Sequence, residues 1–172
     1  HYILKDRLIE WEDRPARMEI AFDTTESEKE KQQLKFTLDA EKMVTNCISA
    51  LYQQNDIVET TTQVLRMFGS FLSADRTYII YIRDGLMYND YEWCADGILP
   101  QKEYLQALPL SLIERWITYF NRKECIIIKD LGQLKDSEPD EYRILHGQSI
   151  SSLVAAPLEE DGKLLGYLGV DN

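Results

Sequence analysis

The chain has 172 residues, which suffices for one complete domain and an attached segment but not for two domains of usual size. Acidic side chains outnumber basic ones by 30 to 19, and the net charge of −11 argues against nucleic acid and against anionic membrane surfaces as partners. No apolar run approaches the roughly 20 residues of a membrane helix, and the widely spaced Cys47, Cys94 and Cys125 predict neither a disulfide framework nor a zinc site but reduced thiols in the cytoplasm.

The first 25 residues predict two β-strands, residues 2–11 and 16–22, joined by a polar turn that contains Pro15. Met18, Ile20 and Phe22 alternate with other residues at the period of two that indicates one covered face of a sheet. Two strands alone are marginally stable. We therefore expect either that a segment upstream of this chain completes the sheet, or that the hairpin packs on the rest of the chain.

Residues 26–51 predict a long connector helix, since Thr25 and Glu28 have the spacing of a capping box at a helix start. Apolar side chains recur along it at spacings of four, three and four. This candidate dimer interface consists of Ala40, Val44, Cys47 and Leu51. Such a surface suits a second helix or a homodimer. The alternative is a helix that covers the sheet of its own domain.

Asp56 is placed to cap a second helix that ends near Ser73. Residues 76–83 and 86–93 then predict a β-hairpin around the turn pair Asp84-Gly85, because both segments are rich in β-branched and aromatic residues. A helix near residues 109–121 and an apolar strand at 125–128 follow.

A short helix at 139–147 and a closing hairpin, 151–158 with 163–171, complete the order of elements. Helices thus alternate with pairs of strands. The connection within each pair is short, so the two strands must be antiparallel. The pattern predicts an α+β fold, with an antiparallel sheet that has helices packed on its faces, preceded by the N-terminal β-hairpin and the connector helix.

The closing hairpin carries a resemblance to a known family. Residues 153–158 and 165–172, together with the segment 148–152 that leads into them, resemble the end of a GAF domain. Residues 91–97, Leu105 and Trp116 resemble the variety found in bacterial multidomain signalling proteins, especially those that end in cyclic-di-GMP synthase or phosphodiesterase domains. The resemblance spans residues 40–172 and lacks the C-terminal helix usual in the family.

Residues 1–25 resemble the last two strands of a PAS domain, in which Asp23-Thr24-Thr25 stands where that family has its exit motif into a signalling helix. This resemblance implies that the chain is a piece of a longer protein whose upstream sensory core lies outside it. The alternative is an incidental hairpin with a polar turn.

The GAF resemblance implies a ligand pocket between the sheet and the helices and loops of residues 93–146. The candidate ligand-binding residues are Trp93, Asp96, Trp116, Asp130, Tyr142 and His146. Two aromatic rings with a few polar groups suit a small planar or amphipathic molecule. No cofactor follows from the sequence, and the alternative for each residue is core packing or a solvated loop.

The ligand and enzyme signatures of special GAF subclasses are mostly missing. No cysteine is followed directly by histidine, as in bilin-tethering members, and the residue set of the cyclic-nucleotide binders has no counterpart. His146 could ligate haem, but histidine near a helix end more often caps it. One branch of the family reduces free methionine sulfoxide with cysteines, whereas Cys94 stands between the acidic Glu92 and Asp96, which disfavour a thiolate.

We therefore predict a regulatory sensor module of a signal-transduction protein, without catalytic activity of its own, that is cytoplasmic, homodimeric and able to bind a small molecule. The alternative is a dimerisation spacer without a ligand. The thiol enzyme is a third hypothesis.

Overall fold

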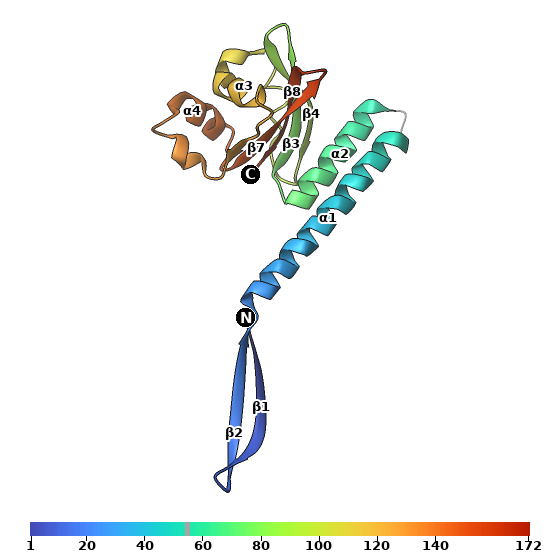
Figure 1. Cartoon of the computed structure of the whole chain (residues 1–172). Coiled ribbons are helices and arrows are strands. Elements are labelled where there is room, and N and C mark those ends of the chain that lie inside the picture. The colour runs from blue at the N-terminus through green and yellow to red at the C-terminus, as the bar shows by residue number, and fades with distance from the viewer. Residues whose placement is uncertain (54–55) are drawn as a thin grey trace. The chain divides into compact units, whose positions relative to one another are not determined.

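The computed structural model describes residues 1–53 and 56–172, which form two compact units, His1–Thr45 and Asn46–Asn172. The first unit contains the predicted hairpin, β1 (Tyr2–Trp11) and β2 (Arg14–Asp23), and the beginning of the long helix α1 (Thr25–Gln53) (Figure 1). The strands pair antiparallel over their whole length, from Tyr2 opposite Asp23 to Trp11 opposite Arg14. Almost every residue of both strands is exposed to solvent.

Helix α1 begins where the sequence predicts, but the capping interactions differ from the predicted box. The Asp23 carboxylate accepts a hydrogen bond of 2.9 Å from the backbone N–H of Thr25, and the side-chain and backbone hydrogen bonds of Thr25 hold the pKa of Asp23 below its usual range. The Thr25 hydroxyl instead accepts a hydrogen bond from the N-terminal ammonium of His1. The helix end is thus tied to the hairpin that precedes it.

The second unit is built on a six-stranded sheet with the strand order β5-β4-β3-β8-β7-β6. Its strands are β3 (Arg76–Arg83), β4 (Leu86–Cys94), β5 (Leu108–Pro109), β6 (Ile126–Ile128), β7 (Leu153–Glu160) and β8 (Lys163–Asp171). Every strand pair among these is antiparallel, so the predicted α+β fold and both predicted hairpins are confirmed.

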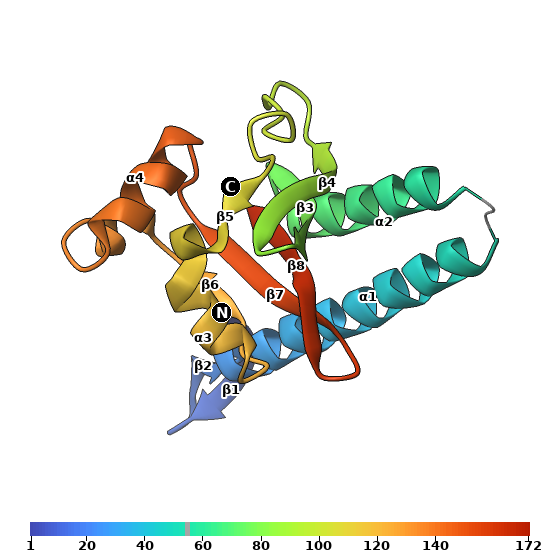
Figure 2. The same cartoon turned by 90° about the horizontal axis from the view of Figure 1, so that it is seen from above.

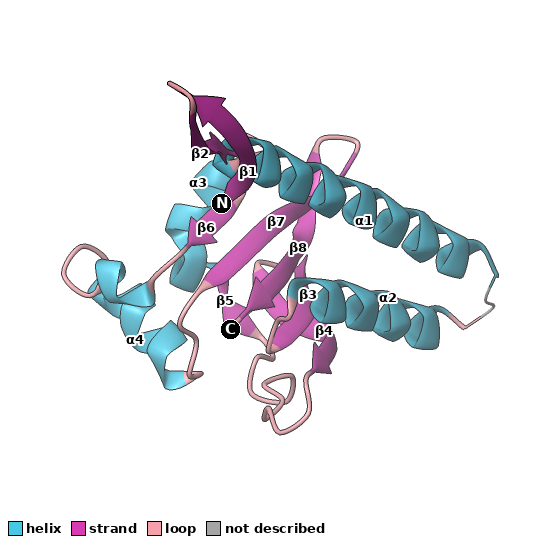
Figure 3. Ribbon diagram, turned by 90° about the horizontal axis from the view of Figure 1, so that it is seen from below, coloured by secondary structure: helices cyan, strands magenta, loops and turns pink. Residues whose placement is uncertain are grey.

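Helices lie on both faces of this sheet, with α2 (Ile57–Leu72) on one face and α3 (Glu114–Phe120) and α4 (Pro139–Gly147) on the other (Figures 2 and 3). The Asp56 carboxylate caps α2, as predicted, by accepting hydrogen bonds from two backbone N–H groups. The single helix predicted near 109–121 is divided: β5 is followed by a 3-10 turn, Leu110–Ile113, and then by α3. A second 3-10 turn, Leu131–Leu134, precedes α4.

The main hydrophobic core lies between the sheet and the α3/α4 face. Phe120 is fully buried, and Trp116 and Tyr167 contact it with ring centroids 6.3 and 5.5 Å away. On the opposite face, the Thr77 hydroxyl donates a hydrogen bond of 2.8 Å to the carbonyl of Leu65 in α2. Helix α2 therefore covers this face over β3 and β4, whereas Ile127 of β6 and Val154 of β7 are exposed.

Candidate functional site

A cavity of about 60 Å³ lies on the α3/α4 face of the sheet. Strands β3, β4 and β8 provide its floor, α3 and α4 provide two of its sides, and residues between β4 and α3 close it. The lining residues are Tyr78, Ile80, Met87, Leu105, Leu108, Leu112, Ile113, Trp116, Glu141, Ile144, Leu145, Gln148 and Tyr167. Most of them are apolar, which is typical of small-molecule pockets.

Glu141 of α4 is the one ionisable acid in this wall, and its carboxylate joins α4 to α3. It accepts hydrogen bonds of 2.9 Å from the indole Nε1 of Trp116 and from Nε of Arg115, and one of 2.6 Å from Nη2 of Arg115. The hydrogen bond to Glu141 raises the pKa of Arg115. A fork of this kind fixes both the position and the orientation of the partners, so Trp116 and Glu141 are held rigidly at the cavity wall.

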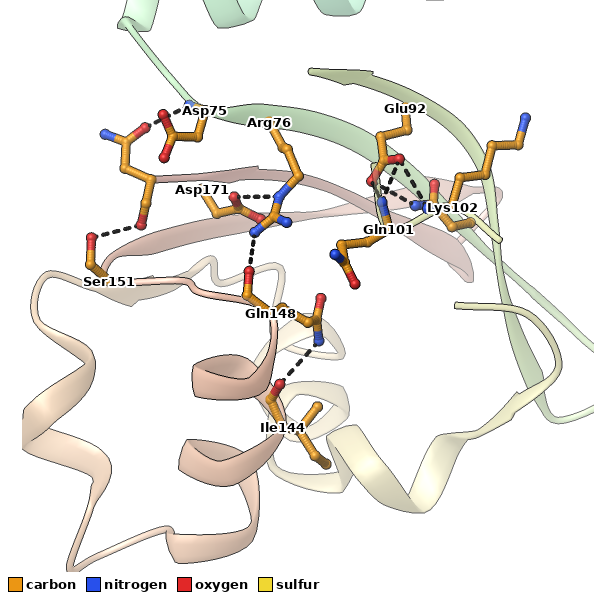
Figure 4. Close-up of polar contacts among 11 residues, drawn as sticks. Asp75, Arg76, Glu92, Gln101, Lys102, Ile144, Gln148, Ser151 and Asp171 are labelled. Carbon is orange, nitrogen blue, oxygen red and sulfur yellow. Dashed lines mark hydrogen bonds and ion pairs between the residues drawn. The ribbon is translucent and has the colours of Figure 1, made fainter. Parts of the chain in front are cut away.

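A buried ion pair lies at the end of the sheet, next to the cavity (Figure 4). Nε of Arg76 in β3 donates to the Asp171 carboxylate of β8 at 2.9 Å, and Nη2 of Arg76 donates to the backbone carbonyl of Gln148 at 2.9 Å. Both side chains are nearly inaccessible to solvent. Burial raises the pKa of Asp171 to about 6, although the attraction of Arg76 opposes this shift.

Glu92 anchors the segment that closes the cavity on the β4 side (Figure 4). Its carboxylate accepts hydrogen bonds from the backbone N–H groups of Gln101 and Lys102, both at 2.9 Å. It also accepts a longer one from Asn89 Nδ2. These contacts hold the segment that carries Leu105 against the sheet, because the carbonyl of Leu105 accepts from the backbone N–H of Asn89.

Of the six ligand-binding residues predicted from the sequence, Trp116 lines the cavity and Trp93 lies on the opposite face of the sheet. Trp93 packs against α2, where its ring occupies the space beside Gly69: a Cβ at Gly69 would lie 2.1 Å from Trp93 Cζ3. Successive side chains of a strand point to opposite faces, and a bulge between Ile79 and Ile80 sets which residues of β4 face α2. The sequence pattern did not reveal that bulge.

The other four predicted residues are outside the cavity wall. Asp96 is exposed in the turn after β4, and Asp130 is exposed and accepts a hydrogen bond from the backbone N–H of Gly132 as the cap of the following turn. Tyr142 packs against the core from the far side of α4, and its ring stacks on the exposed His146 with centroids 5.2 Å apart. The structure thus brings Tyr142 and His146 together but keeps them apart from Trp116.

Two of the three thiols, Cys47 and Cys94, have a raised pKa. Burial, with a further contribution from Glu92, raises the pKa of Cys94 to about 11, so the reactive thiolate is scarce at neutral pH. Cys47 is buried and Cys125 is exposed, and burial raises the pKa of Cys47 as well. At Cys94 the positive charge of Arg76 lowers the pKa, but burial and Glu92 outweigh it.

Within residues 1–53 and 56–172, no group of three or more His, Cys, Asp or Glu side chains is arranged to hold a metal ion. Among the helices of the same ranges, none is long and apolar enough to cross a membrane.

The four predicted dimer-interface residues of α1 have different environments. Cys47 is buried, so it belongs to the interior of its own chain, whereas Val44 and Leu51 are 44% and 55% exposed and Ala40 is partly exposed. All four lie on one side of the continuous helix α1, as their spacing predicts. The contact of this side with a second copy stays a prediction.

Comparison with known proteins decides the family. The sequence profile of the GAF domain family matches residues 56–172. The chain belongs to the GAF family. The GAF-like fold and the assignment as a regulatory domain of a signalling protein, both predicted from the closing hairpin, are thereby supported at the level of the family.

The individual proteins to which the chain is similar share modest sequence identity with it. The "Methanogenesis regulatory histidine kinase FilI" of Methanothrix harundinacea (strain 6Ac) is 30% identical over 131 residues, which is 68% of this chain but 14% of that kinase. This chain therefore spans a small part of that curated relative. Among solved structures, the phycocyanobilin-bound GAF domain of a cyanobacterial phytochrome has a TM-score of 0.65 at 18% identity, over 77% of this chain and 79% of its own. A variant of the chromophore-binding domain of Stigmatella aurantiaca bacteriophytochrome has a TM-score of 0.66 at 15% identity, over 97% and 64% of the two chains.

Several residues of this site were missed by the sequence analysis, above all Glu141, Gln148 and the Arg76–Asp171 pair. Arg76 and Asp171 left a weak signal in the sequence, since each is a charged residue at the end of an apolar strand. Glu141 left none, because its partners Arg115 and Trp116 are distant in sequence and meet it only after α3 and α4 have packed.

Proposed function

We propose that this chain is a sensor module that binds a small molecule in the cavity and transmits its presence to the end of the GAF domain. The observation that supports this proposal is the position of Gln148. Its side chain lines the cavity, while its carbonyl accepts the hydrogen bond from Arg76, the partner of Asp171. A change at the cavity wall therefore reaches the last residue of β8 through two hydrogen bonds.

The residue that follows β8 is held by the same region. The carbonyl of Asn172 accepts hydrogen bonds from the backbone N–H groups of Ser151 and Ser152, and the Asn172 side chain accepts from the N–H of Asp75. A ligand that moves the C-terminal end of α4 would shift residues 148–152 and would thereby change their hydrogen bonds to Asn172. Such a shift requires that the ligand bind one arrangement more tightly than the other.

The output of the signal lies outside the 172 residues under this proposal. The similarity to a regulatory histidine kinase favours a kinase-type signalling protein, and the resemblance to proteins that end in cyclic-di-GMP enzymes keeps that output as the alternative. In either case the chain itself regulates and does not catalyse. The free cysteines and the net charge of −11 favour a cytoplasmic site without contact to nucleic acid or membrane.

An upstream PAS-like domain is part of the proposal. The register of β1 and β2 places Ile3, Ile20 and Phe22 on one face, and all three are exposed. An apolar face of this size on a two-stranded sheet is usually covered. Residues 1–25 would thus complete a PAS-like sheet, and residues 26–51 would connect it to the GAF domain as a signalling helix.

A dimerisation spacer without a ligand is the second candidate function, and exposed apolar side chains near the α1–α2 connection favour it. Within the second unit Ile48, Leu51 and Tyr52 of α1 and Ile57 and Val58 of α2 are between 48% and 87% exposed. Helices that present such side chains commonly pair with a second copy. A homodimer through this surface is compatible with both functions.

Native mass spectrometry of the purified chain tests the two functions together, since it reports bound small molecules and the ratio of monomer to dimer. A retained small molecule that is lost in a cavity-filling Ile144→Phe variant supports the sensor. A ligand-free dimer that charged substitutions at Val44 and Leu51 convert to monomer supports the spacer. A dimer that persists in the doubly charged variant would contradict the proposed interface.

A further inference from the structure

The electrostatic character of the cavity wall restricts the charge of the ligands that can bind there. Among the described residues that form this wall, none is lysine, arginine or histidine, and the single ionised side chain is that of Glu141. The remaining polar groups are the hydroxyls of Tyr78 and Tyr167, the amide of Gln148 and the indole N–H of Trp116, which is engaged by Glu141. Burial keeps the pKa values of both tyrosines above their usual range, so both hydroxyls stay neutral near neutral pH.

The nearest arginines are already engaged and are not free to pair with an anion. Arg115 is bound by both oxygens of Glu141. Arg76 is 5% exposed, and its donors are directed to Asp171 and to the carbonyl of Gln148. An anionic ligand would have to break one of these pairs and would leave a buried carboxylate without its partner, which is costly.

A buried acceptor without a partner lies under the cavity wall. Asn89 is fully buried, and its Oδ1 has no hydrogen-bond partner among the described residues. Asn89 is opposite Ile80 in the β3–β4 register, so the two side chains share the cavity face of the sheet. Its backbone N–H holds the carbonyl of Leu105, a residue of the wall. Asn89 is not one of the residues that line the cavity, so it supports the wall through Leu105 and sets no hydrogen-bond requirement on the ligand.

We propose that the cavity selects small, mainly apolar molecules that are neutral or cationic, and that it rejects anions. This inference rests on the proposed function, whose cavity it uses. A cavity of about 150 Å³ accommodates benzene. The present cavity of about 60 Å³ is smaller, so a one-ring molecule enters it only after the wall has moved outward. Leu112, a partly exposed member of the wall, is placed to move outward.

Three one-ring probes of nearly equal size test the charge preference on the full chain: benzyl alcohol, benzylamine and benzoate. The readout is the proton–nitrogen NMR signal of the Trp116 indole, which donates to Glu141 at the cavity wall and is assigned by its loss in Trp116→Phe. We expect benzyl alcohol and benzylamine to shift this signal in a saturable way. Benzoate should bind at least tenfold more weakly.

Glu141→Gln removes the carboxylate of the wall and keeps the shape of the side chain, and it also leaves Arg115 without its ionic partner. It should bring the affinity for benzoate to within about threefold of that for benzyl alcohol. Where this variant does not fold, Leu112→Lys offers a second measurement on the exposed part of the wall and should shift the preference toward benzoate. Ile144→Phe is the control that fills the cavity and should weaken all three probes.

The outcomes separate the ligand class from the sensor function. Benzoate binding to the unmodified chain as tightly as benzyl alcohol, or no saturable shift with any probe, would overturn the ligand class. Saturable binding of the neutral and cationic probes without any shift of the Ser151 and Asn172 amides would support the ligand class and contradict transmission to the end of the domain. Shifts of both the Trp116 indole and these amides would support both proposals.

Discussion

Two hairpins of this chain have nearly the same local construction and opposite surroundings. The β1–β2 hairpin pairs Tyr2 to Trp11 with Arg14 to Asp23, and the β7–β8 hairpin closes the GAF sheet between two neighbouring strands. The side chains of the first are exposed on both faces, whereas β7 and β8 contribute Leu153, Ala155 and Tyr167 to the core. The ladder of hydrogen bonds is thus common to both, and burial distinguishes them.

The turns of the two hairpins also differ, and the turn of the first hairpin is again the less favourable one. Both turns have two residues with positive φ: Glu12 and Asp13 at 51° and 58° in the first, Asp161 and Gly162 at 51° and 77° in the second. Glycine adopts this backbone without strain, and other residues do so at a cost. The first hairpin therefore lacks both a covered face and a relaxed turn, which indicates that its stability depends on a partner surface.

The largest expected effect concerns the buried ion pair under the GAF sheet. Arg76→Met should reduce the free energy of unfolding by about 3–5 kcal/mol, because the Asp171 carboxylate stays buried without its partner. The double substitution Arg76→Met/Asp171→Leu should recover most of this loss. Urea denaturation followed through the tryptophan signal measures both. A loss below about 1 kcal/mol in the single variant would contradict the role of the pair.

A matched pair of truncations tests burial directly. Leu153→Ala in β7 should cost about 2–5 kcal/mol, because Leu153 is 2% exposed and its removal leaves a cavity. Leu8→Ala in β1 should change the stability by less than about 0.5 kcal/mol, because Leu8 is 78% exposed. Thermal denaturation compares the two variants. Equal losses would mean that the first hairpin is covered in the isolated chain, for example in a dimer.

The pH dependence of stability provides a further test of the ion pair. The folded-state pKa of Asp171, raised to about 6, lies above the value of 3.8 that an unperturbed aspartate has. Between these values the folded state holds a proton that the unfolded state has lost, so stability falls as the pH rises from about 4 to about 6 and is flat above. The contribution of this group is on the order of 3 kcal/mol. Arg76→Met/Asp171→Leu should lack this contribution, and identical pH profiles for the two proteins would contradict the shift.

The smallest expected effects concern the turns. Asp13→Gly should stabilise the first hairpin by a few tenths to about 1 kcal/mol, because glycine relieves the strain of a positive φ. Gly162→Asp should destabilise the closing hairpin by about 1 kcal/mol for the opposite reason. Amide hydrogen exchange in β1, β2, β7 and β8 reports each change locally. The same sign in both variants would refute the turn argument.

The sequence was sufficient for the fold wherever a local pattern matched the period of its element. The strand pairs at 76–93 and 153–171, the cap at Asp56 and the order of helices and strands all follow from alternation, turn residues and capping side chains within about ten residues of one another. The same local logic failed at the start of α1, where the Asp23 carboxylate accepts a hydrogen bond from the backbone N–H of Thr25 in place of the predicted capping box. It also failed at residues 108–121, where a short strand and a 3-10 turn replace the first part of the helix.

The composition of the candidate site depended on tertiary structure more than the fold did. Trp116 could be proposed from the sequence only through the resemblance to the GAF family, and the structure places it in the cavity wall. Trp93 could not be assigned to a face, because one bulge in β4 changes the alternation for every residue beyond it. Glu141, Gln148 and the pairing of Arg76 with Asp171 join residues between 25 and 95 positions apart. No spacing rule connects such positions, since their proximity arises only when the sheet closes and α3 and α4 pack against it.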